Sequence, residues 1–162
     1  MSKVSCKHRA VRKMLVAAML SVPIIASGCA MQRAHTDVAV CRHEPVAQAV
    51  ARYAEAIHKM DTTQTSAFYL PDGVLSHANG APLVGPLAVK KLLDGFAAYT
   101  VISQSMPVDQ VLRQTTGWRV TGHYVQHVRL PEGNEVKASG RYESDWVCAS
   151  QEGWRLARLH TY

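Results

Sequence analysis

Three histidines in the second half of the chain, His123, His127 and His160, are of a residue type that binds metal ions and transfers protons. His123 and His127 lie four residues apart in a segment with the alternating pattern of a strand. Their side chains would therefore share one face, roughly 13 Å apart. One zinc ion, which binds nitrogen at about 2 Å, cannot be held by both. We expect these histidines on the solvated face of a sheet, and the sequence predicts no metal site.

Other chemical motifs do not occur in the sequence, which has no glycine-rich phosphate loop, zinc-finger spacing or nucleophile elbow, and we expect no cofactor. The chain has 18 Lys and Arg against 12 Asp and Glu, a net charge of +6. Five basic residues and no acidic ones precede residue 29, so the remainder has 13 basic and 12 acidic side chains. A nucleic-acid surface needs a clustered basic excess, and we expect no such partner.

The first 28 residues have the order of a secretory signal. A basic head precedes an apolar run at 14–26, too short to span a bilayer, and small residues then lead to Cys29. This ending resembles a bacterial lipoprotein signal, which implies cleavage after residue 28 and a membrane anchor through a lipid on Cys29. Ala30 and Met31 include no aspartate for inner-membrane retention, which favours the outer membrane of a Gram-negative cell. The alternative is a soluble periplasmic protein, since a larger aliphatic residue is usual at Ala26.

Two of the four cysteines remain once the signal and the lipidation site are set aside. Cys6 belongs to the signal and Cys29 is the predicted lipidation site, which leaves Cys41 and Cys148. An even number of cysteines in an exported protein indicates a disulfide. We therefore predict a bond between Cys41 and Cys148, with a pair of buried free thiols as the alternative.

Three helices are predicted in the first half of the exported chain. Apolar residues recur at steps of four and three over 46–60, which predicts an amphipathic helix. Asp61 is placed to end that helix and to cap a second, short one. A third helix is predicted to begin at Gly85-Pro86, with a core face that extends to Phe96.

Strands dominate the second half, and turn residues separate them. Pro71-Asp72-Gly73 is predicted as a turn, and Asn79-Gly80 as the turn of a hairpin. Strands are predicted at 74–78, 82–84, 100–114, 118–130, 135–149 and 154–162. Helices first and antiparallel strands last indicate one α+β domain over 44–162, which follows a tether at 29–43.

The order of these elements, together with several short motifs, resembles the nuclear transport factor 2-like superfamily, which includes SnoaL-like domains and ketosteroid isomerases. The motifs are Arg52-Tyr53, Asp61, Phe68-Tyr69-x-Pro71-Asp72, Gly85 with Ala88, Gly140-Arg141-Tyr142, Asp145-Trp146 and Gly153-Trp154-Arg155. The resemblance implies a cone-shaped domain in which the N-terminal helices pack on a curved, mainly antiparallel sheet around a pocket. Because this superfamily holds enzymes, ligand binders and assembly modules, fold alone does not give the function.

The resemblance to ketosteroid isomerases implies three candidate catalytic residues. Tyr53 and a protonated Asp145 would donate hydrogen bonds to a developing enolate, and His77 stands where the family has an aspartate base. A neutral histidine can accept that proton at physiological pH. Each residue also has a structural interpretation: Tyr53 as a packed core aromatic, Asp145 as an ionised salt-bridge partner, and His77 as a surface residue.

The leading functional expectation is an exported, lipid-anchored domain that binds a small apolar or mixed ligand. One alternative is an isomerase, lyase or hydrolase that uses His77 as base with Tyr53 and Asp145 as donors. Another is a homodimeric interaction module of the cell envelope, because sheets of this superfamily often dimerise face to face.

Overall fold

The computed structural model describes residue 41 and residues 44–78, 80–149 and 152–162. All of these residues fall within the compact unit Gln32–Tyr162. The predicted signal, the lipidation site Cys29 and most of the tether lie outside the described residues, as does Asn79 of the predicted hairpin turn. Within the described ranges, no helix has both the length and the apolar character that crossing a membrane requires.

The first two predicted helices form as expected. Helix α2 spans Val46–His58 and buries the apolar face that the spacing predicts, including Val50 and Tyr53. Helix α3 follows at Thr62–Ala67, and the Asp61 side chain caps it by accepting a hydrogen bond of 2.8 Å from the backbone N–H of Gln64.

The third helix, α4, spans Gly85–Asp94 and buries Val89 completely. The expectation that its core face extends to Phe96 is wrong, because the helix ends at Asp94 and Phe96 is 40% exposed. The N–H of Gly95 donates to the carbonyl of Leu92 in a tightened last turn. Phe96 packs edge-on against Tyr99 instead.

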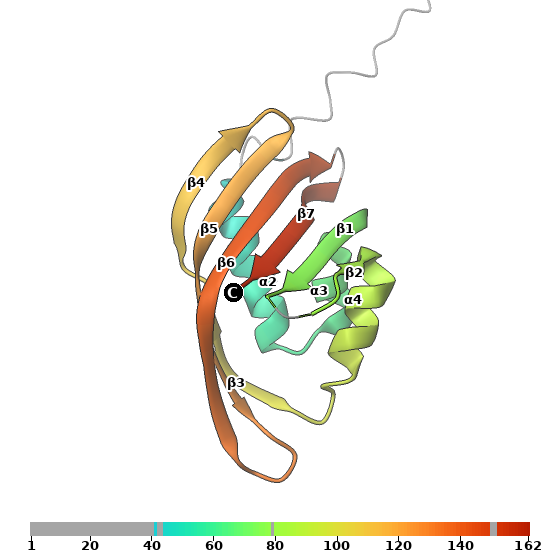
Figure 1. The fold of residues 1–162 in the computed structure, drawn as a ribbon, viewed down its shortest axis with the longest axis vertical. Coiled ribbons are helices and arrows are strands. Elements are labelled where there is room, and N and C mark those ends of the chain that lie inside the picture. Colours follow the sequence, from blue (N-terminus) through green and yellow to red (C-terminus); the bar gives the residue numbers. More distant parts are fainter. Residues whose placement is uncertain (1–40, 42–43, 79, 150–151) are drawn as a thin grey trace, which may run out of the picture. The chain divides into compact units, whose positions relative to one another are not determined.

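One seven-stranded sheet carries the rest of the domain, with helices packed on one face (Figure 1). Its strands are β1 (Tyr69–His77), β2 (Leu83–Val84), β3 (Thr100–Ser105), β4 (Val108–Gln114), β5 (Gly117–Arg129), β6 (Glu135–Ala149) and β7 (Gly153–Thr161). The order is β2-β1-β7-β6-β5-β3, and β4 also pairs with β5. Only β1 and β7 pair in parallel in this described sheet. The α+β architecture with a curved, mostly antiparallel sheet is therefore confirmed.

Two predicted strand boundaries differ from the structure. The segment 100–114 is two strands, β3 and β4, that meet at Met106 and Pro107 and pair with different parts of β5. Strand β1 begins at Tyr69 and includes the predicted turn at Pro71-Asp72-Gly73 as an irregularity in its pairing with β7. A side chain at Gly73 would lie 2.6 Å from the carbonyl oxygen of Leu156, so this close approach of two strands requires glycine.

Alternation along β6 separates the core from the opposite face of the sheet. Tyr142, Ser144 and Trp146 are buried, and the Trp146 ring packs against Tyr53 of α2. Successive residues of a strand point to opposite faces, so Glu143 and Asp145 project away from the helices. The sheet thus lies between Asp145 and the aromatic core.

Candidate functional site

Tyr53 lies in the centre of the core. Its side chain is 3% exposed, and its ring packs edge-on against Phe68, Tyr69 and Trp146 with centroids 5.6, 6.1 and 6.5 Å away. Its hydroxyl lies 2.8 Å from the hydroxyl of Tyr69, which is also buried. Burial raises the pKa of Tyr53 to about 12, although the hydrogen bond from Tyr69 acts in the opposite direction. Tyr53 is therefore a neutral phenol whose hydroxyl is paired with another phenol.

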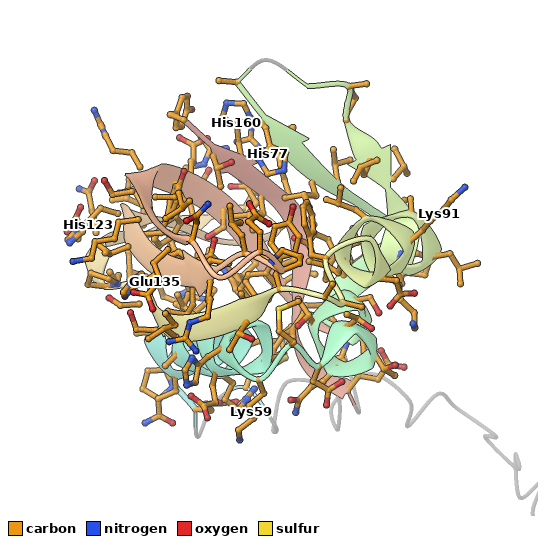
Figure 2. All side chains as sticks on the ribbon, turned by 90° about the horizontal axis from the view of Figure 1, so that it is seen from below. Lys59, His77, Lys91, His123, Glu135 and His160 are labelled. Atoms are coloured by element: carbon orange, nitrogen blue, oxygen red, sulfur yellow. A yellow bond between two sulfur atoms is a disulfide. The ribbon has the colours of Figure 1, made fainter. Side chains whose placement is uncertain are left out.

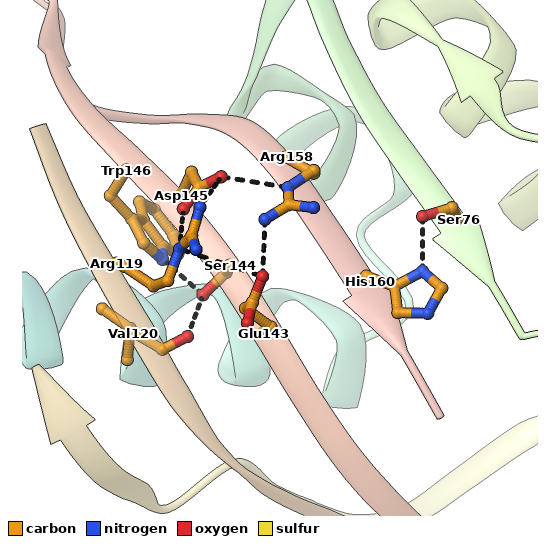
Figure 3. Close-up of polar contacts among 9 residues, drawn as sticks. All are labelled: Ser76, Arg119, Val120, Glu143, Ser144, Asp145, Trp146, Arg158 and His160. Atoms are coloured by element: carbon orange, nitrogen blue, oxygen red, sulfur yellow. Dashed lines mark hydrogen bonds and ion pairs between the residues drawn. The ribbon is translucent and has the colours of Figure 1, made fainter. Parts of the chain in front are cut away.

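Asp145 belongs to an ion-pair network on the other face of the sheet (Figure 3). Arg119 of β5 donates from Nε to Oδ1 at 2.8 Å and from Nη2 to Oδ2 at 3.3 Å. Arg158 of β7 donates from Nε to Oδ2 at 3.0 Å, and its Nη2 donates to Glu143 Oε1 at 2.5 Å. Two carboxylates and two guanidiniums therefore alternate across three strands.

The network keeps Asp145 ionised. Partial burial acts to raise the pKa of Asp145, but hydrogen bonds from Arg119 and Arg158 outweigh it and hold the pKa below its ordinary value. An ionised carboxylate accepts hydrogen bonds and has no proton to donate. The expectation of a protonated Asp145 donor is thus wrong, and the salt-bridge interpretation describes the structure.

His77 lies at the exposed end of β1, beside the last strand (Figure 2). Its Nδ1 atom is 2.6 Å from Oγ1 of Thr161, its register partner on β7. No hydrogen bond, ion pair or ring contact joins His77, Tyr53 and Asp145 to one another among the described residues. The structure therefore places these three residues in a strand end, the core and the opposite face, and does not bring them together.

His123, His127 and His160 each pair with a different neighbour, and Figure 2 shows His123 and His160 well apart. His123 Nδ1 lies 3.3 Å from Asp109, and His127 Nε2 lies 2.9 Å from Glu135. His160 Nδ1 lies 2.7 Å from the hydroxyl of Ser76. In the described part of the chain, no three His, Cys, Asp or Glu side chains are grouped so that they could hold a metal ion.

A groove with a volume of about 740 Å³ lies at the N-terminal end of α2. It lies between the first turn of that helix and the ends of four strands. Its lining is formed by Cys41, Glu44, Pro45, Val46, Ala47, Val111, Arg113, Trp118, Cys148 and Trp154.

Two long-range contacts hold the walls of this groove in place. The predicted disulfide is formed, and it joins Cys41 to Cys148 across 107 residues with a Cα–Cα distance of 6.0 Å. The indole N–H of Trp154 donates to the backbone carbonyl of Glu44 at 2.8 Å, which ties β7 to the segment before α2. Opposite them, the guanidinium of Arg113 lies 5.8 Å from the centroid of the Trp118 ring. The segment before α2 is therefore cross-linked to β6 and hydrogen-bonded to β7 on this side of the groove.

Sequence reasoning did not find this groove. Trp118 and Trp154 each follow a glycine that opens a strand, and both lie near the predicted disulfide partner Cys148 in the sheet, where Trp154 and Cys148 are register partners. That signal could have pointed to an aromatic surface beside the disulfide. It becomes visible only when the strand register is known.

The sequence model of the SnoaL-like domain matches residues 39–160, most of the chain. The chain belongs to the SnoaL-like domain family. Among curated proteins, none matches this SnoaL-like chain in sequence.

Solved structures with the same fold are similar to this SnoaL-like domain at low sequence identity. A ketosteroid isomerase-like protein from Erwinia carotovora atroseptica is 18% identical, with a TM-score of 0.63 over 78% of this chain and 95% of that one. A nuclear transport factor 2-like protein from Novosphingobium aromaticivorans is 20% identical, with a TM-score of 0.60 over 75% and 80%. A Catenulispora acidiphila protein solved in complex with S-DNPA is 14% identical, with a TM-score of 0.59 over 74% and 92%. These likenesses show the fold.

Proposed function

We propose that this SnoaL-like domain binds a small apolar or mixed ligand in the groove beside Trp118 and Trp154. The observation that carries the proposal is the groove itself, with its volume of about 740 Å³ and its mainly apolar and aromatic lining. Ligand pockets of about 300–1,000 Å³ with such linings, fixed by a few polar groups, are typical of small-molecule sites. The S-DNPA complex of the Catenulispora acidiphila protein supports the same class of function.

Among the described residues, neither the centre of the domain nor the candidate triad of Tyr53, His77 and Asp145 offers a comparable site. The space around Tyr53 is occupied by the rings of Phe68, Tyr69 and Trp146. General acid–base chemistry requires the participating groups within hydrogen-bond reach of one substrate. Since Asp145 lies across the sheet from Tyr53, no observation favours the enzyme based on His77.

A screen for ligand-induced stabilisation tests the binding function. Compounds from the lipid, steroid and aromatic polyketide classes are mixed with the protein, and the melting temperature is measured. A ligand at 100 times its Kd stabilises by about 2.7 kcal/mol, which raises Tm by roughly 10 °C for a domain of this size. Trp118→Ala is expected to abolish the shift. Phe96→Ala, which removes an exposed aromatic outside the groove, is the control and should retain it. No shift with any compound class would contradict the proposal.

The same proposal includes export and anchoring through Cys29, with residues 1–28 removed as a signal and the domain held at the outer membrane of a Gram-negative cell. The disulfide between Cys41 and Cys148 supports export, because such bonds persist in oxidising compartments. Metabolic labelling with a fatty acid tests the anchor. Cys29→Ser is expected to lose the label and to shift the protein from the membrane to the soluble fraction. Label that persists in this variant would contradict anchoring at Cys29.

The sequence also led us to expect a homodimer that acts as an interaction module. Light scattering of the purified protein tests whether the homodimer forms. The face of the sheet that would form such a dimer carries the ion-pair network of Arg119, Glu143, Asp145 and Arg158. Because those charges already pair within one chain, we do not assign the dimer a function.

A further inference from the structure

Arg113 lies where two adjoining hollows of the domain meet. It lines both the groove of about 740 Å³ and a smaller hollow of about 230 Å³, and so do Trp118, Cys148 and Trp154. Because the two hollows share these four residues, we treat them as one elongated groove with Arg113 near its middle.

The two ends of this elongated groove differ in polarity. The larger end is lined on one side by aliphatic side chains from the start of α2 and from β4, namely Pro45, Val46, Ala47 and Val111. The smaller end is lined by Gln114, Thr115 and Thr116 at the turn between β4 and β5, together with Gly117 and Val147. A ligand that extends along the groove would therefore meet mainly apolar groups at the larger end and more polar groups at the smaller one.

Among the described residues, one positive charge of the groove has no carboxylate partner. Arg113 and Glu44 are the charged residues among the described lining. The carboxylate of Glu44 is paired with Arg52 outside the groove. Within the described residues, the guanidinium of Arg113 contacts the Trp118 ring and no carboxylate.

We propose that the groove binds an amphipathic monocarboxylate, with its hydrocarbon body in the larger, apolar end and its carboxylate paired with Arg113. The inference rests on the ligand-binding function proposed above and names the ligand class. The planar guanidinium presents a fork of N–H donors that matches a carboxylate. Trp118, against which Arg113 packs, offers its ring surface to the adjoining part of the ligand.

The charges of Arg113 and Glu44 favour a monoanionic ligand over a cation or a dianion. A cationic ligand would be repelled by Arg113, since the carboxylate of Glu44 is already neutralised by Arg52. A dianionic phosphate would leave one negative charge unpaired beside apolar side chains, which is unfavourable. One carboxylate balances the guanidinium of Arg113, which no described carboxylate contacts.

A matched pair of probes tests the ligand class. Decanoate and 1-decanol have the same chain length and differ in the charged head group, and calorimetric titration of the purified protein gives the Kd of each. We expect decanoate to bind about tenfold more tightly, because a charge-assisted hydrogen bond at an exposed guanidinium is at the lower end of its range. Arg113→Met keeps the aliphatic stem and is expected to remove this tenfold preference without changing the affinity for 1-decanol.

Two further variants control for charge and for folding. Lys137→Met removes an exposed cation of β6 that lies outside the groove, and it should keep the preference for decanoate. Arg113→Lys restores the charge and should recover most of it. Equal binding of decanoate and 1-decanol by the unmodified protein, or a preference that persists in Arg113→Met, would overturn the ligand class while the binding function stands. Failure of both probes to bind would count against the groove as a binding site.

Discussion

Replacing Tyr53 by phenylalanine is expected to lower the free energy of unfolding by about 1–2 kcal/mol. The hydroxyls of Tyr53 and Tyr69 lie 2.8 Å apart, and the two residues are 3% and 2% exposed. Removing one hydroxyl leaves the other buried without its partner, and a buried unsatisfied polar group costs about 1–3 kcal/mol. Part of that cost is recovered because the phenylalanine ring itself stays packed. The expected loss of unfolding free energy therefore lies in the lower half of this range.

A double-mutant cycle isolates the hydroxyl pair from the packing of the rings. Tyr53→Phe combined with Tyr69→Phe leaves no orphaned hydroxyl, so the pair of substitutions is expected to cost less than the sum of the single ones by about 1 kcal/mol or more. Urea unfolding at pH 7, followed by tryptophan fluorescence, measures each free energy. Tyr162→Phe changes a residue that is 61% exposed and should stay within about 0.5 kcal/mol of the unmodified protein.

Additive single effects would refute this reasoning, because they would show that the two hydroxyls do not depend on each other.

An alkaline titration provides a second check on the same pair. The pKa of Tyr53 is raised by burial to about 12, so between pH 10 and pH 12 the unfolded chain releases a proton that the native state keeps. Stability is therefore fully present below pH 10 and falls above it by about 1.4 kcal/mol per pH unit for each such tyrosine. The doubly substituted protein should show a shallower fall.

Three further predictions concern the disulfide, the ion pairs and the strand end. Reduction of the bond between Cys41 and Cys148 is expected to destabilise by roughly 4–5 kcal/mol in the chain-entropy model for a separation of 107 residues. An unchanged urea midpoint in reductant would contradict it, and a double serine variant serves as the reductant-insensitive control. Asp145→Asn should cost less than about 1 kcal/mol at pH 7 because the network is partly solvated. The pKa of Asp145 is lowered in the folded protein, so the stability difference between Asp145→Asn and the unmodified protein should persist above pH 3.8. It should disappear as the pH falls below the folded pKa. A pH-independent difference would contradict the ion-pair explanation. His77→Ala is expected to change stability by less than about 0.5 kcal/mol in thermal unfolding, since the ring is exposed, and a larger loss would contradict that placement.

Local patterns in the sequence predicted the elements whose formation depends on neighbouring residues. The apolar spacing gave α2 with Val50 and Tyr53 in the core, and Asp61 caps α3 as its position suggests. The boundaries that failed depend on distant partners. Pro71-Asp72-Gly73 continues β1 because β7, more than eighty residues later, pairs with it in parallel. Pro107, which lacks an N–H group, marks the break between β3 and β4, a signal that the alternation on either side concealed.

The candidate triad failed for a reason that the period of a strand explains. Asp145 and Trp146 are adjacent, so only one of them can face the core. Burial of the large Trp146 and Tyr142 rings on the helix side fixes the parity of β6 and turns Asp145 toward Arg119 and Arg158. The ketosteroid isomerase-like motif was present in the sequence, but the roles of its residues depend on which face each one occupies.

The position of the groove links the proposed ligand binding to the disulfide. Cys41 and Cys148 both line the groove, and their bond holds the segment before α2 against the end of β6. A hydrogen bond from Trp154 to Glu44, worth about 1 kcal/mol, and the burial of Val46 in the core also hold this wall. The disulfide is therefore the covalent part of this wall, which the reduced protein would lack. Tyr53 and its neighbours fill the centre of the domain, so the proposed binding site lies at its edge. Under the proposed export, the oxidising compartment would also supply the cross-link of that site.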